Sequence, residues 1–160
     1  MASPRNKNRI GAAAGEFDQF AAELELATRG FLEVNVEVLE QMEKKISLQA
    51  LHALQSLERL GPSLVTELGD DLDLLPSTAS RLSDRLAEAG WITRAVSPVN
   101  RRATVLELTS SGRSVLRELL TLRKNALKSV VGQMDDEDRA ALLQGTRAFT
   151  AARAKFSEPS

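Results

Sequence analysis

Hydroxyl and guanidinium side chains gather on one face of the segment from Pro76 to about Ala89. Its apolar residues recur three and four positions apart, which predicts an amphipathic helix with that row packed inward. Serine and threonine hydroxyls can bond phosphates or base edges, and arginine can bind guanine bidentately in the major groove. The candidate DNA-binding residues of this helix are Ser77, Thr78, Ser80, Arg81 and Arg85. Arg85 is expected on the DNA backbone. The alternative is an ordinary amphipathic helix with a solvated polar face.

Two short runs of β-prone residues follow this helix, Trp91 to Val96 and Ala103 to Leu108. The loop between them ends in the pair Arg101-Arg102, so the pattern predicts a hairpin with a basic tip. An arginine at such a tip suits the minor groove, where the negative potential rises as the groove narrows. The alternative is two solvated loop arginines. Asp84 is a candidate to support the wing by pairing with one of them.

The sequence on either side of the polar helix indicates the structural unit to which this helix belongs. Apolar residues at helical spacing from Leu64 to Leu68 precede a polar break at residues 70–73. Pro76 suits the first helical turn, and Gly90 suits the helix end because glycine reaches the left-handed conformation without a steric clash. Two helices joined by a short turn, followed by a hairpin, predict a winged helix-turn-helix over residues 47–109.

The same stretch carries a family resemblance. It rests on Gln49, Gly61-Pro62, Glu67-Leu68, Leu72, the run from Pro76 to Leu82, the run from Asp84 to Leu86, Gly90, Arg94, Arg101-Arg102, Leu108-Thr109 and Gly112. In this order the residues resemble the MarR family of bacterial transcription regulators. The resemblance implies an α-helical dimer with two winged-helix lobes, a pseudo-palindromic operator in double-stranded DNA and often a small-molecule effector.

Three residues depart from the family pattern. Asn100 stands where the wing usually has aspartate before its two arginines. Leu75 stands where a helix-capping Ser, Thr or Asp is expected before Pro76, and a missing cap costs about 1 kcal/mol. Ser83 occupies a position that is usually apolar. These departures bear on the detailed DNA preference more than on the fold.

Helices flank the winged unit on both sides. Residues 16–46 and 110–156 carry apolar residues every three or four positions, in stripes too long for a small monomer to cover. We therefore expect them to form a dimerisation region with a second chain. Residues 1–15 are small, polar and basic and are expected to form a flexible arm. The fold class is thus mostly α with a small β-hairpin wing, a winged helix-turn-helix plus helical dimerisation arms.

Composition restricts the remaining classes. The 160 residues include no cysteine, which removes disulfides, cysteine zinc sites and thiol-based sensing. The only histidine, His52, has no partner for a metal site; it is a candidate for an effector pocket, with a partly exposed helix position as the alternative. No catalytic motif is found, so neither an enzyme nor a cofactor nor a metal is expected. No apolar run approaches a membrane span of about 20 residues, and a cytoplasmic protein is expected.

The distribution of charge separates two regions of the chain. The formal net charge is only −1. Residues 76–103 hold five arginines and two carboxylates, whereas residues 16–45 hold eight carboxylates and three cations. A basic lobe and an acidic arm would turn one face of the molecule toward phosphate. We expect a dimeric, sequence-specific DNA-binding repressor modulated by a small effector. The alternative is a helical protein-interaction module with a degenerate winged helix.

Overall fold

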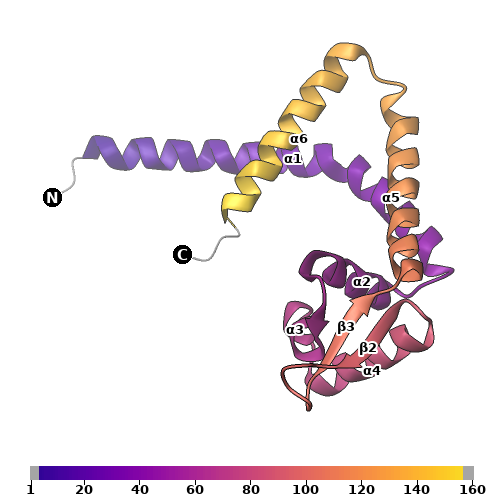
Figure 1. Cartoon of the computed structure of the whole chain (residues 1–160). Coiled ribbons are helices and arrows are strands. Elements are labelled where there is room, and N and C mark those ends of the chain that lie inside the picture. The colour runs from indigo at the N-terminus through magenta and orange to yellow at the C-terminus, as the bar shows by residue number, and fades with distance from the viewer. Residues whose placement is uncertain (1–3, 157–160) are drawn as a thin grey trace.

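The computed structural model describes residues 4–156 and is mostly helical, with one small antiparallel sheet. Figure 1 shows a lobe at one end of the molecule, with the long helices lying outside it. The lobe comprises α2 (Leu48–Leu60), β1 (Ser63–Leu64), α3 (Val65–Asp71), α4 (Pro76–Glu88), β2 (Ile92–Val96) and β3 (Thr104–Leu108). The long helices are α1 (Pro4–Glu43), α5 (Ser110–Val131) and α6 (Asp136–Phe156). The predicted fold class is confirmed. None of these helices combines the length and hydropathy that crossing a bilayer requires.

Polar caps set the starts of three helices. Ser47, Thr109 and Asp135 each accept a hydrogen bond from the backbone N–H three residues later, at 3.3, 3.1 and 2.8 Å. Such a cap satisfies one of the N–H groups that a helix leaves without an internal partner. The caps at Ser47 and Thr109 therefore set the first residues of α2 and α5.

The first helix is longer than the sequence pattern predicts. It begins at Pro4, so residues 4–15 are helical where a flexible arm is expected; residues 1–3 lie outside the described part. Proline suits a first helical position, and the run from Ala12 to Ala14 has high helix propensity, so the segment extends the amphipathic helix that follows. Figure 1 shows this end of α1 projecting beyond the rest of the chain.

The sheet has three strands in the order β1-β3-β2. The predicted wing hairpin forms, and it pairs Ile92 with Leu108 and Val96 with Thr104. The short strand β1 was not predicted, because a helix was expected to begin at Leu64. Two residues show no periodicity, and β1 exists because Ser63 pairs with Leu106, far along the chain.

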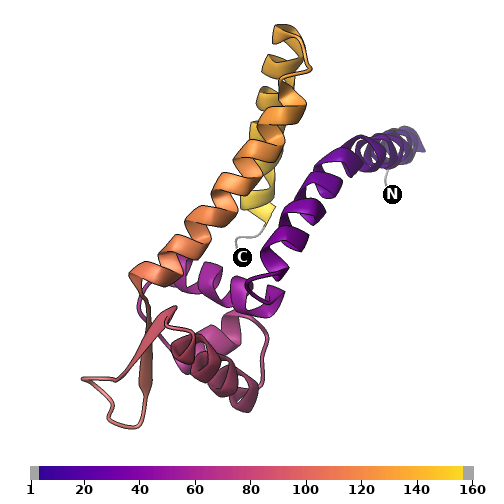
Figure 2. The ribbon, with the colours of Figure 1, turned by 90° about the vertical axis from the view of Figure 1, so that its right-hand side faces the viewer.

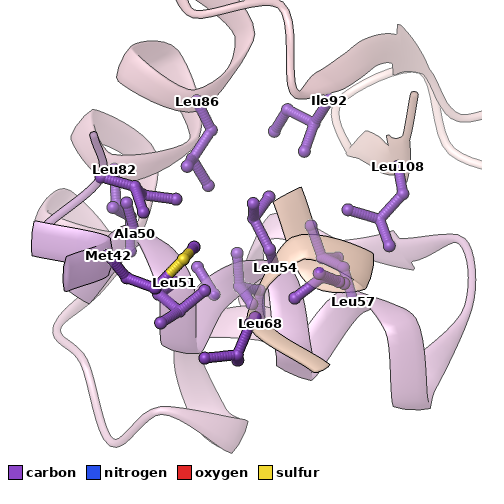
Figure 3. Packing of buried hydrophobic residues seen from close by; sticks show 14 of the residues in the cluster. Met42, Ala50, Leu51, Leu54, Leu57, Leu68, Leu82, Leu86, Ile92 and Leu108 are labelled. Carbon is purple, nitrogen blue, oxygen red and sulfur yellow. The ribbon is translucent and has the colours of Figure 1, made fainter. Parts of the chain in front are cut away.

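The core of the lobe lies where α2 meets α3, α4 and the sheet (Figure 3). The apolar row of α2 is fully buried, as is the predicted inner row of α4; these are Leu51, Leu54, Leu57, Ala79, Leu82 and Leu86. Leu68 of α3 and Leu106 of β3 complete the centre. This packing turns the opposite face of α4 outward.

An ion pair fastens α3 to α2. Nη2 of Arg59 contacts both carboxylate oxygens of Asp71, at 2.7 and 2.6 Å, and Ser56 donates its hydroxyl to the same carboxylate. The hydrogen bond from Arg59, followed by that from Ser56, holds the pKa of Asp71 below its ordinary value. A carboxyl with a lowered folded-state pKa stabilises the protein above its unfolded pKa of about 3.9, and the effect is lost as pH falls through the folded value.

We therefore expect Asp71→Asn to lower the melting temperature at pH 7 and to do so less as the pH falls below about 4. Thermal unfolding followed by circular dichroism at several pH values measures the difference from the parent. Asp70→Asn, on the exposed neighbouring residue, is the matched control. A deficit of Asp71→Asn that is the same at every pH would contradict the role given to this ion pair.

Candidate nucleic-acid interface

The outward face of α4 brings the predicted helix residues together. Ser77, Arg81 and Arg85 are exposed, and Thr78 and Ser80 are half-buried beside them. Thr78, Arg81 and Arg85 line one hollow of about 510 Å³ on this face. The face therefore presents hydroxyl and guanidinium donors to whatever lies against it.

Helix α4 has no side-chain cap and is held by backbone bonds and packing. The carbonyl of Leu75 accepts the N–H groups of Thr78 and Ala79, at 2.9 and 3.0 Å, but its side chain offers no acceptor. Ser83 is fully buried, and its hydroxyl donates to the carbonyl of Ser80 at 2.8 Å, so a polar residue is tolerated in the packed face. Gly90 ends the helix turn at φ +73°, as the sequence predicts.

Arg85 is tied to the helix behind it. Its Nη2 donates to Oε1 of Gln49 on α2, at 3.2 Å. The contact leaves Arg85 exposed while restricting its side chain. Gln49 thus positions Arg85, and the sequence indicates it only as part of the family resemblance. Nothing in its spacing indicates that the first turn of α2 reaches α4.

The wing tip is shaped by two polar side chains. The hydroxyl of Ser97, which is buried, accepts the N–H groups of Val99 and Asn100, each at 3.3 Å. Oδ1 of Asn100 accepts the N–H of Arg102 at 3.0 Å. An asparagine oxygen makes this turn bond as an aspartate would. The tip is therefore defined in spite of the missing acid, and Arg101 and Arg102 are exposed on it.

Asp84 supports the wing through a different arginine from the one expected. It pairs with Nη1 of Arg94 in β2, and not with Arg101 or Arg102 at the tip. The pair joins the outward face of α4 to the base of the hairpin. The prediction was wrong about the partner because the tip extends past the helix, whereas β2 lies directly against it. The sequence pattern indicates Arg94 only through the family resemblance and the local excess of arginines. Its place in the strand after α4 is the one signal for its role.

We expect Asp84→Ala to weaken DNA binding by about 1.4- to 5-fold, because a partly exposed ion pair contributes about 0.2–1 kcal/mol. Equilibrium binding measured for Asp84→Ala, Arg94→Ala and the double variant gives the coupling between the two residues. The double variant is expected to bind like either single one. Fully additive losses would mean that each residue acts on DNA separately and not through the pair.

The helix face and the wing lie at the same end of the lobe. Figure 2 shows the β2–β3 hairpin and α4 at the end opposite to α5 and α6. The exposed arginines of both elements, Arg81, Arg85, Arg101 and Arg102, therefore belong to one end of the molecule. A helix flanked by a basic hairpin can engage adjacent grooves of one duplex.

The winged lobe matches a known family. The family model described as "MarR family" matches residues 46–104. The transcriptional repressor MprA of Escherichia coli is 31% identical over 144 residues, covering 84% of this chain and 80% of MprA. The chain belongs to the MarR family. As a member of the MarR family, it is a DNA-binding transcriptional regulator and not an enzyme.

Two further similar proteins extend the match beyond the lobe. The transcriptional repressor MdtR of Bacillus subtilis is 28% identical over 123 residues, which is 76% of this chain and 79% of MdtR. The crystal structure of RV1404 from Mycobacterium tuberculosis has a TM-score of 0.71 and 29% identity, over 90% of this chain and 96% of that one. The long helices of this MarR-family chain are therefore part of the similarity.

His52, the candidate for an effector pocket, is exposed on α2. A hollow of about 180 Å³ lies between α2 and α5, and other residues line it: Gln55, Glu58, Leu116, Arg117, Leu119, Leu120 and Arg123. The spacing of the α5 arginines does not mark them as site residues, because it fits a solvated helix face equally well.

Proposed function

We propose that this MarR-family regulator binds a pseudo-palindromic operator as a homodimer, with residues 47–109 of each subunit as the DNA-binding domain. In this arrangement α4 lies in the major groove, where Ser77, Thr78, Ser80 and Arg81 face base edges or nearby phosphates. Arg85 contacts the DNA backbone, and Arg101 and Arg102 reach the minor groove. The observation that carries the proposal is the placement of the polar α4 face and the arginine-tipped wing at one end of the lobe.

Unpartnered apolar surface on the long helices supports the homodimer. The large exposed apolar side chains of this region include Phe17, Phe20, Leu120, Val130, Leu143 and Phe149. A hollow of about 400 Å³ between α1 and α6 is lined mainly by apolar groups, among them Leu24, Phe31 and Phe149. Exposed apolar surface on this scale marks an interaction site. A second copy, packed through residues 16–46 and 110–156, would cover it.

Selection of bound sequences from a random pool of duplex DNA tests the operator proposal. We expect a two-fold symmetric consensus with half-sites about one helical turn, or roughly 34 Å, apart. Sedimentation at micromolar concentration tests the dimer in parallel. An asymmetric consensus, or a chain that stays single at that concentration, would overturn the homodimer.

We further propose that the regulator acts as a repressor whose DNA binding a small effector modulates. The names of MprA and MdtR describe those relatives as repressors. The hollow between α2 and α5 lies where the lobe meets the long helices, so a ligand there would favour one spacing of the two lobes. Nε of Arg123 at this hollow is buried and has no hydrogen-bond partner among the described residues.

An effector with an acidic group and an apolar body fits these walls, because Arg117 and Arg123 outnumber the single acid Glu58 beside three leucines. A panel of small carboxylic acids of graded size, titrated against the protein–operator complex, tests this. We expect at least one acid to change operator affinity in the parent and to have less effect on Arg123→Gln. Acids that act equally on both proteins would overturn the assignment to this hollow.

A further inference from the structure

Leu75 is an exposed leucine at the entrance to α4. It is 73% exposed, whereas Leu74 and Leu72, one and three residues earlier, pack against the core. The run of leucines before α4 is therefore divided between the interior and the surface. Among these leucines, Leu75 is the one whose apolar side chain has no role in packing the described part of the chain.

Leu75 occupies the capping position of α4, where a polar residue would stabilise the helix. It is the residue before the first helical residue and has an extended backbone, φ −61° and ψ 146°, which is the geometry of a helix cap. Ser47, Thr109 and Asp135 hold the equivalent positions of α2, α5 and α6 and accept a backbone N–H there. A serine at residue 75 would satisfy α4 in the same way. Leucine gives up this cap and exposes an apolar side chain as well.

The major groove of DNA presents an apolar group that an exposed leucine could contact. Residues at the N-terminus of a recognition helix contact base edges. The C5-methyl of thymine is the apolar group that base edges present in that groove, and apolar side chains contact it. Leu75 directly precedes Pro76 and Ser77, at the end of α4 that such a helix turns toward the bases.

We propose that Leu75 contacts the C5-methyl of a thymine in each operator half-site and so selects thymine at that position. This rests on the proposed binding of α4 in the major groove. It adds a base-specific apolar contact to the hydroxyl and guanidinium donors of the helix. With leucine at this position α4 lacks a stabilising side-chain cap. The proposed contact instead lets the protein distinguish thymine from the other pyrimidine, cytosine.

Replacement of thymine by deoxyuridine tests the contact, because it removes the methyl group and leaves base pairing intact. The selected consensus is synthesised with symmetric deoxyuridine substitutions, one thymine position at a time. The parent protein is expected to lose about fourfold in affinity per methyl at one position of each half-site, the amount expected for one buried methyl group. Leu75→Ala is expected to bind the two DNAs alike.

Three variants sharpen the result. Leu75→Met keeps an apolar side chain and is expected to retain sensitivity to the methyl group. Leu75→Ser is expected to lose that sensitivity. Its melting temperature is expected to rise, because serine supplies the side-chain cap that α4 lacks. Val99→Ala removes an exposed apolar side chain from the wing tip and is the matched control. It should keep the full deoxyuridine effect, because the methyl group lies in the other groove.

The failures are distinguishable. If no symmetric consensus is selected, the proposed function fails and this contact fails with it. If a consensus is bound but no thymine in it responds to deoxyuridine, operator binding stands and the role of Leu75 is overturned. The same conclusion follows if Leu75→Ala keeps the sensitivity of the parent.

Discussion

Replacing Arg81 with alanine is expected to weaken operator binding by about 1–3 kcal/mol per half-site and to relax base preference at one position in each. Arg81 is exposed in the middle of the outward face of α4, beside Thr78 and Arg85. A guanidinium in this place can form two parallel hydrogen bonds with N7 and O6 of guanine, and no other base presents two adjacent acceptors in the major groove. Affinities for the consensus and for each single-base variant measure both parts of the effect.

Arg101→Ala is the control for Arg81→Ala. Arg101 lies at the wing tip and is expected to act mainly through charge, so its loss weakens all sequences more evenly. The slope of log affinity against log salt concentration should become less steep by about one unit per subunit. If both variants weakened every sequence uniformly, the division of roles between helix and wing would be wrong.

Gly112→Ala is expected to destabilise the folded chain toward the upper end of the about 1–3 kcal/mol typical of overpacking. A Cβ added at Gly112 would lie 2.2 Å from the carbonyl oxygen of Trp91, a backbone atom that cannot turn aside. At this junction Thr109 donates its hydroxyl to the carbonyl of Gly90, at 2.7 Å, and its N–H to the carbonyl of Trp91, at 3.0 Å. The end of α4, the wing and the start of α5 are joined here.

Urea unfolding measures the decrease in the free energy of unfolding of Gly112→Ala. DNA binding at saturating protein shows whether the folded variant still positions the wing. Gly15→Ala is the control, because an added Cβ there meets nothing within 4 Å. It should be neutral or slightly stabilising. Equal stability of Gly112→Ala and the parent would mean that the junction is looser than the 2.2 Å approach implies.

Much of the lobe was predictable because its signals are local. The buried row of α4 follows from a 3.6-residue period, and the helix ends follow from Ser47, Thr109 and Gly90, whose side chains or backbone freedom act within a few residues. The outward-facing donors were found by the same logic, since the residues opposite a buried row must face outward. Their contacts with DNA stay predictions.

The contacts that hold these elements together depend on long-range packing. Strand β1 forms only because Leu106 lies beside it, and Arg85 bonds Gln49 only because α2 and α4 cross. The hairpin holds three arginines, Arg94, Arg101 and Arg102, that could pair with Asp84. The packing of β2 against α4 brings Arg94 to it. No periodicity records such choices, because each joins residues that are distant along the chain.

The sequence by itself determined the winged-helix class, the family and the set of donors on one face of α4. It did so because hydrophobic period, caps and turns are properties of neighbouring residues. The tertiary structure decided which arginine supports the wing and how the wing tip is held without its usual acid. It also decided that Leu75 is exposed while Leu72 and Leu74 pack inward, because burial is settled by which elements meet.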